Sequence, residues 1–443
     1  MAGTTLLRGS LGTAALNVTT RALGFATTLV LAALLGVSGY GAYAWAIAVV
    51  TVLRVPLKLG RDRLLVREVA AHTARSQPGL VRGVIGNSGR AVVVASVGFA
   101  LAAEIVLALA GASSPLLSAL RVGLVVLPFG TLMSVAQGAL QGLHRVVSSQ
   151  LPDALVRPLL FLALTAAVAV AGNGELTAET ALALQALATA AALVATVRLL
   201  WRSLPASVRA AAPRHDRGAW HRSGLTLALN AGLAVIGQRI DLILVGALLG
   251  ASSAGVYGLA VAAASVAALP LVALTLPLSP LVAELHARGE HARLARTITV
   301  STRWTLGATV IVGAALAAAA PVGLPLLGHA FAAGSGPLAL LCLAAIVNSA
   351  FAANGLVLMM AGLERLAAVA TAAGAASCTV FAALLIPAAG LRGAAAAVAA
   401  SMLVSNAVAA YFTWARLGLD TSFLGRRPTR ATQPPRIVQS KSI

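Results

Sequence analysis

The sequence predicts an all-α, polytopic membrane protein with about twelve transmembrane helices in two six-helix bundles. Three observations lead to this prediction. Hydrophobic residues make up 59% of the 443 residues and charged residues only 10%, whereas about a quarter of a soluble domain is charged. Apolar runs of about 20 residues, long enough to cross a bilayer as a helix, recur along the whole chain. The motifs that open the first half return in the second half.

This internal repeat links residues 14–43 with residues 227–257. Both segments contain Ala-Leu-Asn, then Ala-Leu-Leu-Gly, then glycine and tyrosine two residues apart. The corresponding positions are Ala33–Gly36 with Gly41 and Tyr43, and Ala247–Gly250 with Gly255 and Tyr257. With six helices in each half, both halves enter the membrane in the same sense. The repeats are therefore parallel, and we expect a pseudo-two-fold axis along the membrane normal.

Each expected span is an apolar run bounded by glycine, proline, serine or charged residues. The spans cover residues 10–35, 43–59, 91–110, 115–140, 152–171, 178–200, 224–249, 255–278, 299–327, 336–361, 366–387 and 393–417. They divide the chain into an N-terminal bundle, a basic cytoplasmic linker, a C-terminal bundle and a basic tail that is predicted to be disordered. The corresponding ranges are 1–200, 201–222, 223–419 and 420–443.

Basic residues gather in alternate connections between the spans, which predicts the orientation. The connection between the second and third spans holds six arginines, and the linker and the tail are also basic. The intervening connections, such as residues 36–41 and 250–254, are short and uncharged. By the positive-inside rule both termini lie in the cytoplasm, and the protein crosses the cell membrane many times. The net charge of +20 is explained by these loops, so we expect no nucleic-acid partner.

Cationic side chains inside the expected spans are the main functional signal. A charge at the bilayer centre costs about 2.5–3.5 kcal/mol on insertion scales, so it persists where it faces a wet cavity or a partner. Arg21 and Arg239 lie deep in the first and seventh spans, Arg54 and Lys58 share one face of the second, and Arg303 lies in the ninth. A cavity lined by these cations suits an anionic, phosphate-bearing substrate. Lys58 and Arg303 could instead reach back to the cytoplasmic surface.

Two acidic residues are candidates for ion coupling. Asp241 lies deep in the seventh span, two residues from Arg239, so the two side chains point to nearly opposite sides and are not partners. Glu104 lies in the third span and serves equally well as a hydrogen-bonded packing residue. In the fifth span, Asp153 and Arg157 have the spacing of a structural ion pair.

Neutral polar residues on the same spans would line the cleft or bond to neighbouring helices. They are Asn17, Asn230, Gln238 and Asn348.

Nothing in the sequence predicts an enzyme or a cofactor. It has no glycine-rich phosphate loop, no HExxH motif and no nucleophile elbow. No histidine and cysteine residues have the spacing of metal ligands, so we expect no metal site. The two cysteines, Cys342 and Cys378, lie in apolar runs, and we expect them to be buried core residues without a disulfide.

Five ordered stretches resemble the polysaccharide flippases (Wzx/RfbX-like, PST family) of the multidrug/oligosaccharidyl-lipid/polysaccharide exporter superfamily. They are LLGVSGYGAY at Leu34–Tyr43, LLVREVA at Leu64–Ala70, ALQGLHR at Ala139–Arg145, RIDLILVGALLGASSAGVYGLA at Arg239–Ala260 and LVAELHARGE at Leu281–Glu290. The resemblance implies a MATE-like fold with two six-helix bundles around a central cleft. It also implies transfer of a polyprenyl-pyrophosphate-linked oligosaccharide across the membrane by alternating access, with the pyrophosphate meeting the cleft cations.

Other functions remain open from the sequence. A cation-coupled multidrug exporter of the same superfamily would favour a cavity rich in acids and aromatics, whereas aromatics are 4% of this chain. A membrane scaffold or polymerase partner of glycan synthesis is a further alternative. The expected partners are the lipid-linked oligosaccharide, membrane lipids and possible glycan polymerases or glycosyltransferases.

Overall fold

The computed structural model describes residues 2–111, 114–172, 176–214, 232, 235–351 and 353–418. The secondary structure of this part of the chain is helical, without a strand, as the sequence predicts. Eight of the described helices are long and apolar enough to cross a membrane, or nine if α4 and α5, bent by 43°, form one span.

In the first half, the helices alternate between long apolar segments and short connecting pieces. Their bounds are α1 (Ala2–Leu57), α2 (Arg61–Ala74), α3 (Pro78–Leu109), α4 (Pro115–Leu124), α5 (Val126–Gly142), α6 (Val146–Leu151), the π-helix η1 (Pro152–Val156), α7 (Arg157–Ala171), α8 (Ala178–Ser203) and α9 (Ala206–Ala210).

The second half contains two short 3₁₀ segments between its α-helices. Its elements are α11 (Ile240–Ala267), α12 (Leu269–Ala287), α13 (His291–Gly323), η2 (Pro325–Leu327), η3 (His329–Gly334), α14 (Ser335–Ser349), α15 (Ala353–Met360) and α16 (Glu364–Leu417).

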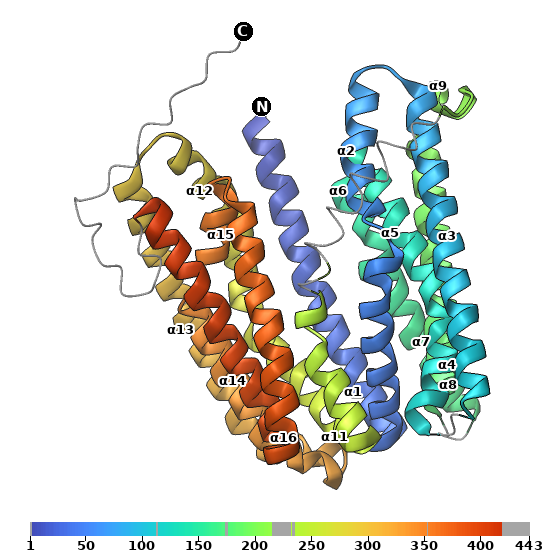
Figure 1. Cartoon of the computed structure of the whole chain (residues 1–443), viewed down its shortest axis with the longest axis vertical. Helices are drawn as coiled ribbons and strands as arrows, with labels where there is room; N and C mark the ends of the chain where they lie inside the picture. The colour runs from blue at the N-terminus through green and yellow to red at the C-terminus, as the bar shows by residue number, and fades with distance from the viewer. Residues whose placement is uncertain are drawn as a thin grey trace.

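Three glycines interrupt long helices in the described part of the chain. Gly36 in α1, Gly250 in α11 and Gly390 in α16 have positive φ angles of 66°, 85° and 57°, which interrupt the helices that contain them. Figure 1 shows α1 and α16 reversing direction, so that each is two antiparallel limbs. Because L-residues with a side chain rarely adopt positive φ, glycine is the residue that permits these tight reversals.

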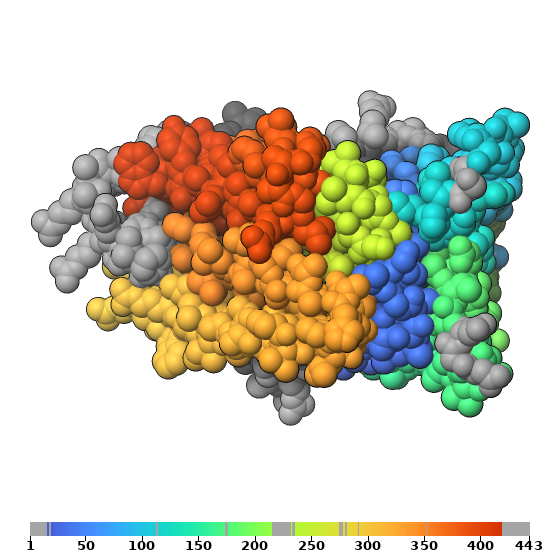
Figure 2. Space-filling view, turned by 90° about the horizontal axis from the view of Figure 1, so that it is seen from below, coloured from blue at the N-terminus to red at the C-terminus, as the bar shows by residue number. Residues whose placement is uncertain are grey.

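The described helices form two groups that meet along α1 and α11. Figure 1 shows α2–α9 on one side and α12–α16 on the other. The two groups come together at the lower end, where α1 packs against α11. Seen from that end in Figure 2, the blue atoms of α1 and the lime atoms of α11 lie side by side near the centre of the face.

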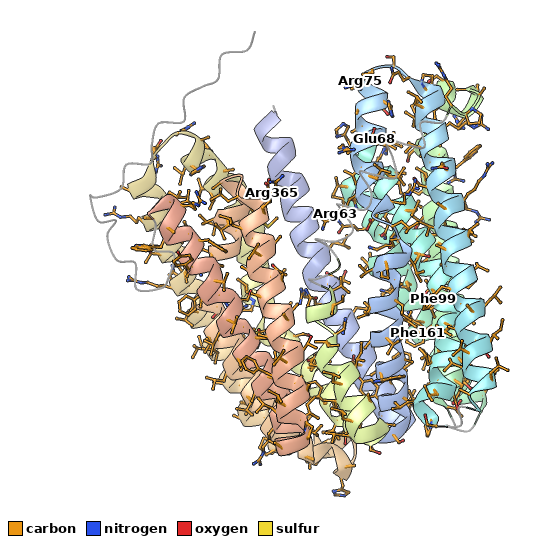
Figure 3. The ribbon with its side chains drawn as sticks, viewed as in Figure 1. Arg63, Glu68, Arg75, Phe99, Phe161 and Arg365 are labelled. Carbon is orange, nitrogen blue, oxygen red and sulfur yellow. The ribbon has the colours of Figure 1, made fainter. Side chains whose placement is uncertain are left out.

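Charged residues mark the opposite end of the molecule. Figure 3 shows Arg63, Glu68, Arg75 and Arg365 at the end where α1 begins. The labelled aromatic residues Phe99 and Phe161 lie much further along the bundle. This distribution is the one expected if the upper end faces the cytoplasm.

The described part of the linker docks onto the first half. Nη1 of Arg82 on α3 donates two hydrogen bonds to this segment. One goes to the carbonyl of Arg209 at 2.6 Å and the other to the carbonyl of Ala211 at 2.8 Å. The amide of Arg214 donates to the carbonyl of Gly79 at 2.9 Å. Residues up to Arg214 are therefore fixed to α3, so any hinge between the halves lies after this position.

Replacing Gly83 tests this docking. A Cβ atom at Gly83 would overlap the backbone carbonyl of Arg214, whereas one at Gly86 on the same helix would meet nothing within 4 Å. We expect Gly83→Ala to release the linker and to expose it to protease, while Gly86→Ala leaves cleavage at the wild-type rate. Limited proteolysis with trypsin, followed by mass spectrometry of the fragments, measures the difference. Equal cleavage of the two variants would contradict the docking.

Candidate functional site

The two copies of the repeated motif pack against each other. A Cβ atom on Gly41 would overlap the carbonyl oxygen of Ala251, and a Cβ atom on Gly255 would overlap the carbonyl oxygen of Val37. The two contacts are related by the repeat, because Val37 corresponds to Ala251 and Gly41 to Gly255. Each half therefore presents a glycine to the backbone of the other, as a pseudo-two-fold axis requires.

Tryptophan 45 strengthens this junction, which we call the glycine seam (residues 37–45 with residues 243–257). The Nε1 of Trp45 donates a hydrogen bond of 2.9 Å to the carbonyl of Ile243 in the other half. Gly246 makes room for its indole, since a Cβ atom there would overlap the ring. Apolar residues of α1, α7, α8, α11, α14 and α16 form one buried cluster around the seam. The protein is thus closed at this end.

Arg21 and Arg239 are both exposed and lie on neighbouring elements. Arg21 is on the first limb of α1, and Arg239 immediately precedes α11, which packs against α1. Arg239 lies within electrostatic range of Tyr40 on α1 and of Asp241. Within the described residues, no carboxylate forms an ion pair with Arg21 or Arg239. Both residues are accessible at the surface of the described structure.

The backbone at Arg239 differs from the prediction. We expected one continuous seventh span, but Gln238 and Arg239 form a turn between two helical pieces. Gly237 lies close to α16, where a Cβ atom would come within 3.0 Å of the Cβ of Ala375. Interrupted helices are found at the substrate sites of transporters. At this turn the amides of Gln238 and Arg239 donate to the carbonyls of Val235 and Ile236. Gln238 is exposed at this turn.

Asp241 is buried and bonded to a tyrosine of the repeated motif. Its carboxylate accepts a 2.9 Å hydrogen bond from the hydroxyl of Tyr257, and both residues are buried. Arg239 lies within electrostatic range of this carboxylate. The corresponding tyrosine of the first half, Tyr43, donates to Gln185 at 3.4 Å and stacks on Phe161. The sequence revealed the repeated tyrosines, but only the structure shows their polar partners.

Arg54 and Lys58 are engaged within the first half. Nη2 of Arg54 donates to the carbonyl of Gly130 at 2.5 Å and to the hydroxyl of Ser134 at 3.2 Å. Gly130 leaves space for the guanidinium, since a Cβ atom there would lie 2.7 Å from its Cζ. Lys58 forms a 2.7 Å ion pair with Asp62 on α2. Both cations are thus held by local partners in this conformation.

The remaining predicted site residues are distributed over several elements. Arg303 is exposed on α13. Glu104 is ion-paired with Arg121 at 2.6 Å, near the lower end of α3. The side chain of Asn348 accepts a 2.8 Å hydrogen bond from Asn406 within the second half. Asn17 lies on α1, but its side chain is outside the description, and Asn230 is outside the described residues.

Two structural predictions are confirmed nearby. Asp153 and Arg157 form a 2.6 Å ion pair within one helical turn. Cys342 and Cys378 are buried and free, as expected of core residues. The carboxylate of Asp153 lies in the π-helix η1, which the sequence pattern did not reveal, and both Asp153 and Arg157 are within electrostatic range of Arg54.

Solved structures share this fold across nearly the whole chain. An inward-facing multidrug resistance transporter of the MATE family aligns with a TM-score of 0.68 at 14% identity, covering 90% of this chain and 94% of that one. Lipid II flippase MurJ in an inward closed conformation aligns with a TM-score of 0.70 at 11% identity, covering 89% and 86%. A transporter from Pyrococcus furiosus, noted for the reverse polarity of its binding pocket, aligns with a TM-score of 0.55 at 14% identity, covering 93% and 94%.

The fold is therefore one that these MATE and MurJ structures share. A family model described as polysaccharide biosynthesis protein matches residues 6–286, more than half of the chain. The chain belongs to this family of membrane proteins. No curated protein sequence is significantly similar to it.

Proposed function

We propose that this protein is a flippase that moves a polyprenyl-pyrophosphate-linked oligosaccharide across the cytoplasmic membrane for the synthesis of a cell-surface polysaccharide. The observation that carries the proposal is the pair of exposed arginines, Arg21 and Arg239, on adjoining elements of the two halves. Guanidinium groups bind phosphate oxygens through two parallel hydrogen bonds, so a diphosphate matches them in charge and geometry. Membership of the polysaccharide biosynthesis family supports a glycan cargo.

The proposed transport cycle follows from the glycine seam. With both termini in the cytoplasm, the closed end faces outward, so the described conformation receives cargo from the inside. The diphosphate binds Arg21 and Arg239, the sugars occupy the wet space beside them, and the polyprenyl chain remains in the bilayer. Opening the seam while the upper ends approach each other exposes the cargo to the outer leaflet. We propose that the cargo replaces the present contacts of three further cations during the cycle. These cations are Arg54, Lys58 and Arg303.

The polar residues along this route would bind the sugars. Among the predicted amides, Gln238 is exposed beside Arg239. Asn17 lies on the same limb of α1 as Arg21, and we propose Asn230 and Asn348 as further contacts in other conformations. Neutral amides suit sugar hydroxyls because each amide both donates and accepts hydrogen bonds.

Asp241 is the proposed ion carrier. It is buried and lies two residues from Arg239. Its hydrogen-bond partner Tyr257 lies further along α11, after the seam residue Gly255. Glu104 is already ion-paired with Arg121, and we therefore assign coupling to Asp241. We expect Asp241→Asn to keep cargo binding but to remove the response of transport to an imposed proton or sodium gradient. Tyr257→Phe, which keeps the carboxylate, should retain that response.

A reconstituted transfer assay tests the proposed function. Purified protein is placed in vesicles that contain a fluorescent polyprenyl-diphosphate sugar, and dithionite reports how much label reaches the outer leaflet. We expect protein-dependent transfer of this lipid and no uptake of a cationic dye such as rhodamine 6G. Dye transport without lipid transfer would instead establish a multidrug exporter. If neither cargo moves while the protein is folded, a scaffold that binds a glycan polymerase or glycosyltransferase is the better account.

A further inference from the structure

A groove in the first half is lined by residues of α3, α4 and α5 and by none of the proposed cargo-binding residues. It runs between α3 and the α4–α5 pair and has a volume of about 590 Å³. Its walls are apolar along most of their length, and Val97, Leu101 and Val125 are exposed there, by 38%, 61% and 50%. Side chains of this kind contact acyl chains in a bilayer.

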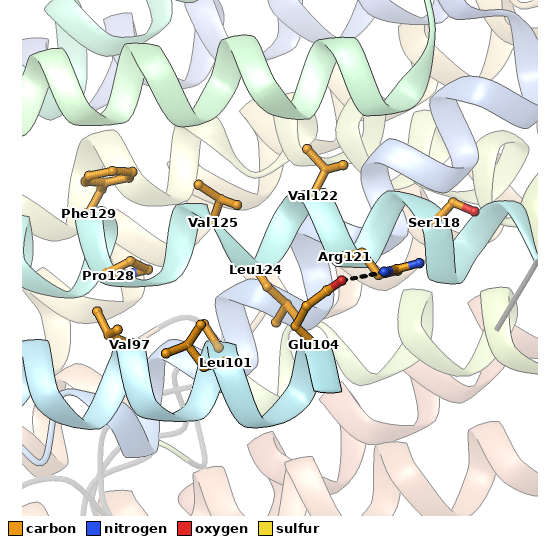
Figure 4. A pocket seen from close by; sticks show the side chains of 11 residues that line it. Val97, Leu101, Glu104, Ser118, Arg121, Val122, Leu124, Val125, Pro128 and Phe129 are labelled. Carbon is orange, nitrogen blue, oxygen red and sulfur yellow. Dashed lines mark hydrogen bonds and ion pairs between the residues drawn. The ribbon is translucent and has the colours of Figure 1, made fainter. Parts of the chain in front are cut away.

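An ion pair closes one end of the groove. Figure 4 shows Glu104 of α3 and Arg121 of α4 joined across it, with the guanidinium Nη2 2.6 Å from Oε1 of Glu104. Both side chains remain about 40% exposed, at 40% for Glu104 and 42% for Arg121. The pair is therefore accessible to a polar group that approaches from the membrane.

The depth of the pair places it near a lipid headgroup. Glu104 lies five residues before Leu109, where α3 ends, and Arg121 lies six residues after Pro115, where α4 begins. At 1.5 Å per residue, both are about 8–9 Å from the seam end of their helices. Val97 lies about 10 Å deeper along α3 by the same rise. The groove thus runs from headgroup level toward the middle of the membrane.

We propose that this groove binds a phospholipid with a primary ammonium headgroup, of the phosphatidylethanolamine class. The ammonium would bind the Glu104 carboxylate, the phosphate would bind the Arg121 guanidinium, and one acyl chain would lie along Leu101, Val97 and Val125. A pair with one positive and one negative group complements a zwitterion. The Glu104–Arg121 pair is a poor match for the polyprenyl diphosphate, because that group carries only negative charge and Glu104 repels it. The proposal is therefore independent of the proposed flippase function.

Competition between two lipids tests this site. Purified protein is equilibrated with equal amounts of palmitoyl-oleoyl phosphatidylethanolamine and phosphatidylglycerol, and native mass spectrometry counts the retained molecules. We expect the wild type to retain the ethanolamine lipid about threefold better, the ratio given by a partly exposed ionic contact of roughly 0.7 kcal/mol. Glu104→Gln keeps the groove open and should remove this preference.

A second pair of variants separates the groove from the charge. Leu101→Trp fills the groove and should lower retained phosphatidylethanolamine about threefold, by the loss of part of the apolar contact. Val106→Trp adds the same ring on the far side of α3, where Val106 is 63% exposed, and should bind lipid like the wild type. A wild type without preference, a Glu104→Gln variant that keeps it, or equal retention by the two tryptophan variants would overturn the proposal. If the Leu101→Trp protein cannot be purified, the lipid preference of Glu104→Gln still decides whether the groove binds phosphatidylethanolamine as proposed.

Discussion

Replacing Arg21 or Arg239 with glutamine is expected to reduce transfer of a polyprenyl-diphosphate sugar by about tenfold or more. A hydrogen bond to a charged group contributes about 1.5–3 kcal/mol, which corresponds to roughly a 10- to 150-fold change. The double variant should lose nearly all activity, because the diphosphate would then lie in a wet but uncharged site. The initial rate of label transfer in reconstituted vesicles measures the effect.

A lysine series shows whether geometry matters as well as charge. Arg21→Lys and Arg239→Lys keep the positive charge but lose the two-point fork of the guanidinium. We expect rates between those of wild type and the glutamine variants. Arg288→Gln is the matched control, since Arg288 is exposed, paired with Glu284 and distant from both arginines in the sequence. Wild-type transfer by the Arg21→Gln/Arg239→Gln double variant would refute the assigned role.

Alanine at either seam glycine should have the second large effect. A Cβ atom on Gly41 or Gly255 would overlap backbone atoms of the other half, which cannot move as the end of a flexible side chain can. Overpacking of this kind costs about 1–3 kcal/mol, and more where the backbone cannot shift. We expect each substitution to lower the melting temperature in detergent by about 4 °C or more, taking about 2–4 °C per kcal/mol for a larger domain.

The same substitutions should also shift the conformational balance. Because they separate the halves at the closed end, they favour the open form of that end. Cysteines introduced at Ser38 and Ser252, which lie in the two copies of the motif, should then cross-link less readily in Gly41→Ala than in wild type. Gly24→Ala on the same helix is the control, since a Cβ atom there meets nothing within 4 Å. Identical melting and cross-linking of Gly41→Ala and Gly24→Ala would show that the seam does not hold the halves together.

Much of the fold follows from features that act locally in the sequence. Apolar runs of membrane length fix the helices, and the repeated Gly-x-Tyr motif indicated two related halves. The motif did not show that Gly41 and Gly255 each contact the copy of the motif in the other half, because a sequence contains no distances between its repeats. Helix α2 was also missed: its buried face packs Leu64, Leu65 and Val69 against α5, and such a partly polar helix has no membrane signal.

The candidate site was less predictable than the fold. Position along a span gives the depth of a charge but not its partner on another helix. Arg54 and Arg21 looked equivalent by depth, yet Arg54 is bonded to the carbonyl of Gly130 and Arg21 is exposed. Likewise, the pairing of Glu104 with Arg121 joins two helices across a connection. Such pairs depend on helix rotation and packing, which single-sequence periodicity leaves undefined.

Direct binding measures the central claim, that Arg21 and Arg239 together bind the diphosphate of the cargo. Isothermal titration of the purified protein with a short-chain polyprenyl diphosphate gives its dissociation constant. We predict that the Arg21→Gln/Arg239→Gln double variant binds at least about 100-fold more weakly than wild type, a loss of roughly 2.7 kcal/mol. We also predict that added salt weakens wild-type binding and has little effect on the variant. Equal affinities for the two proteins would contradict the account.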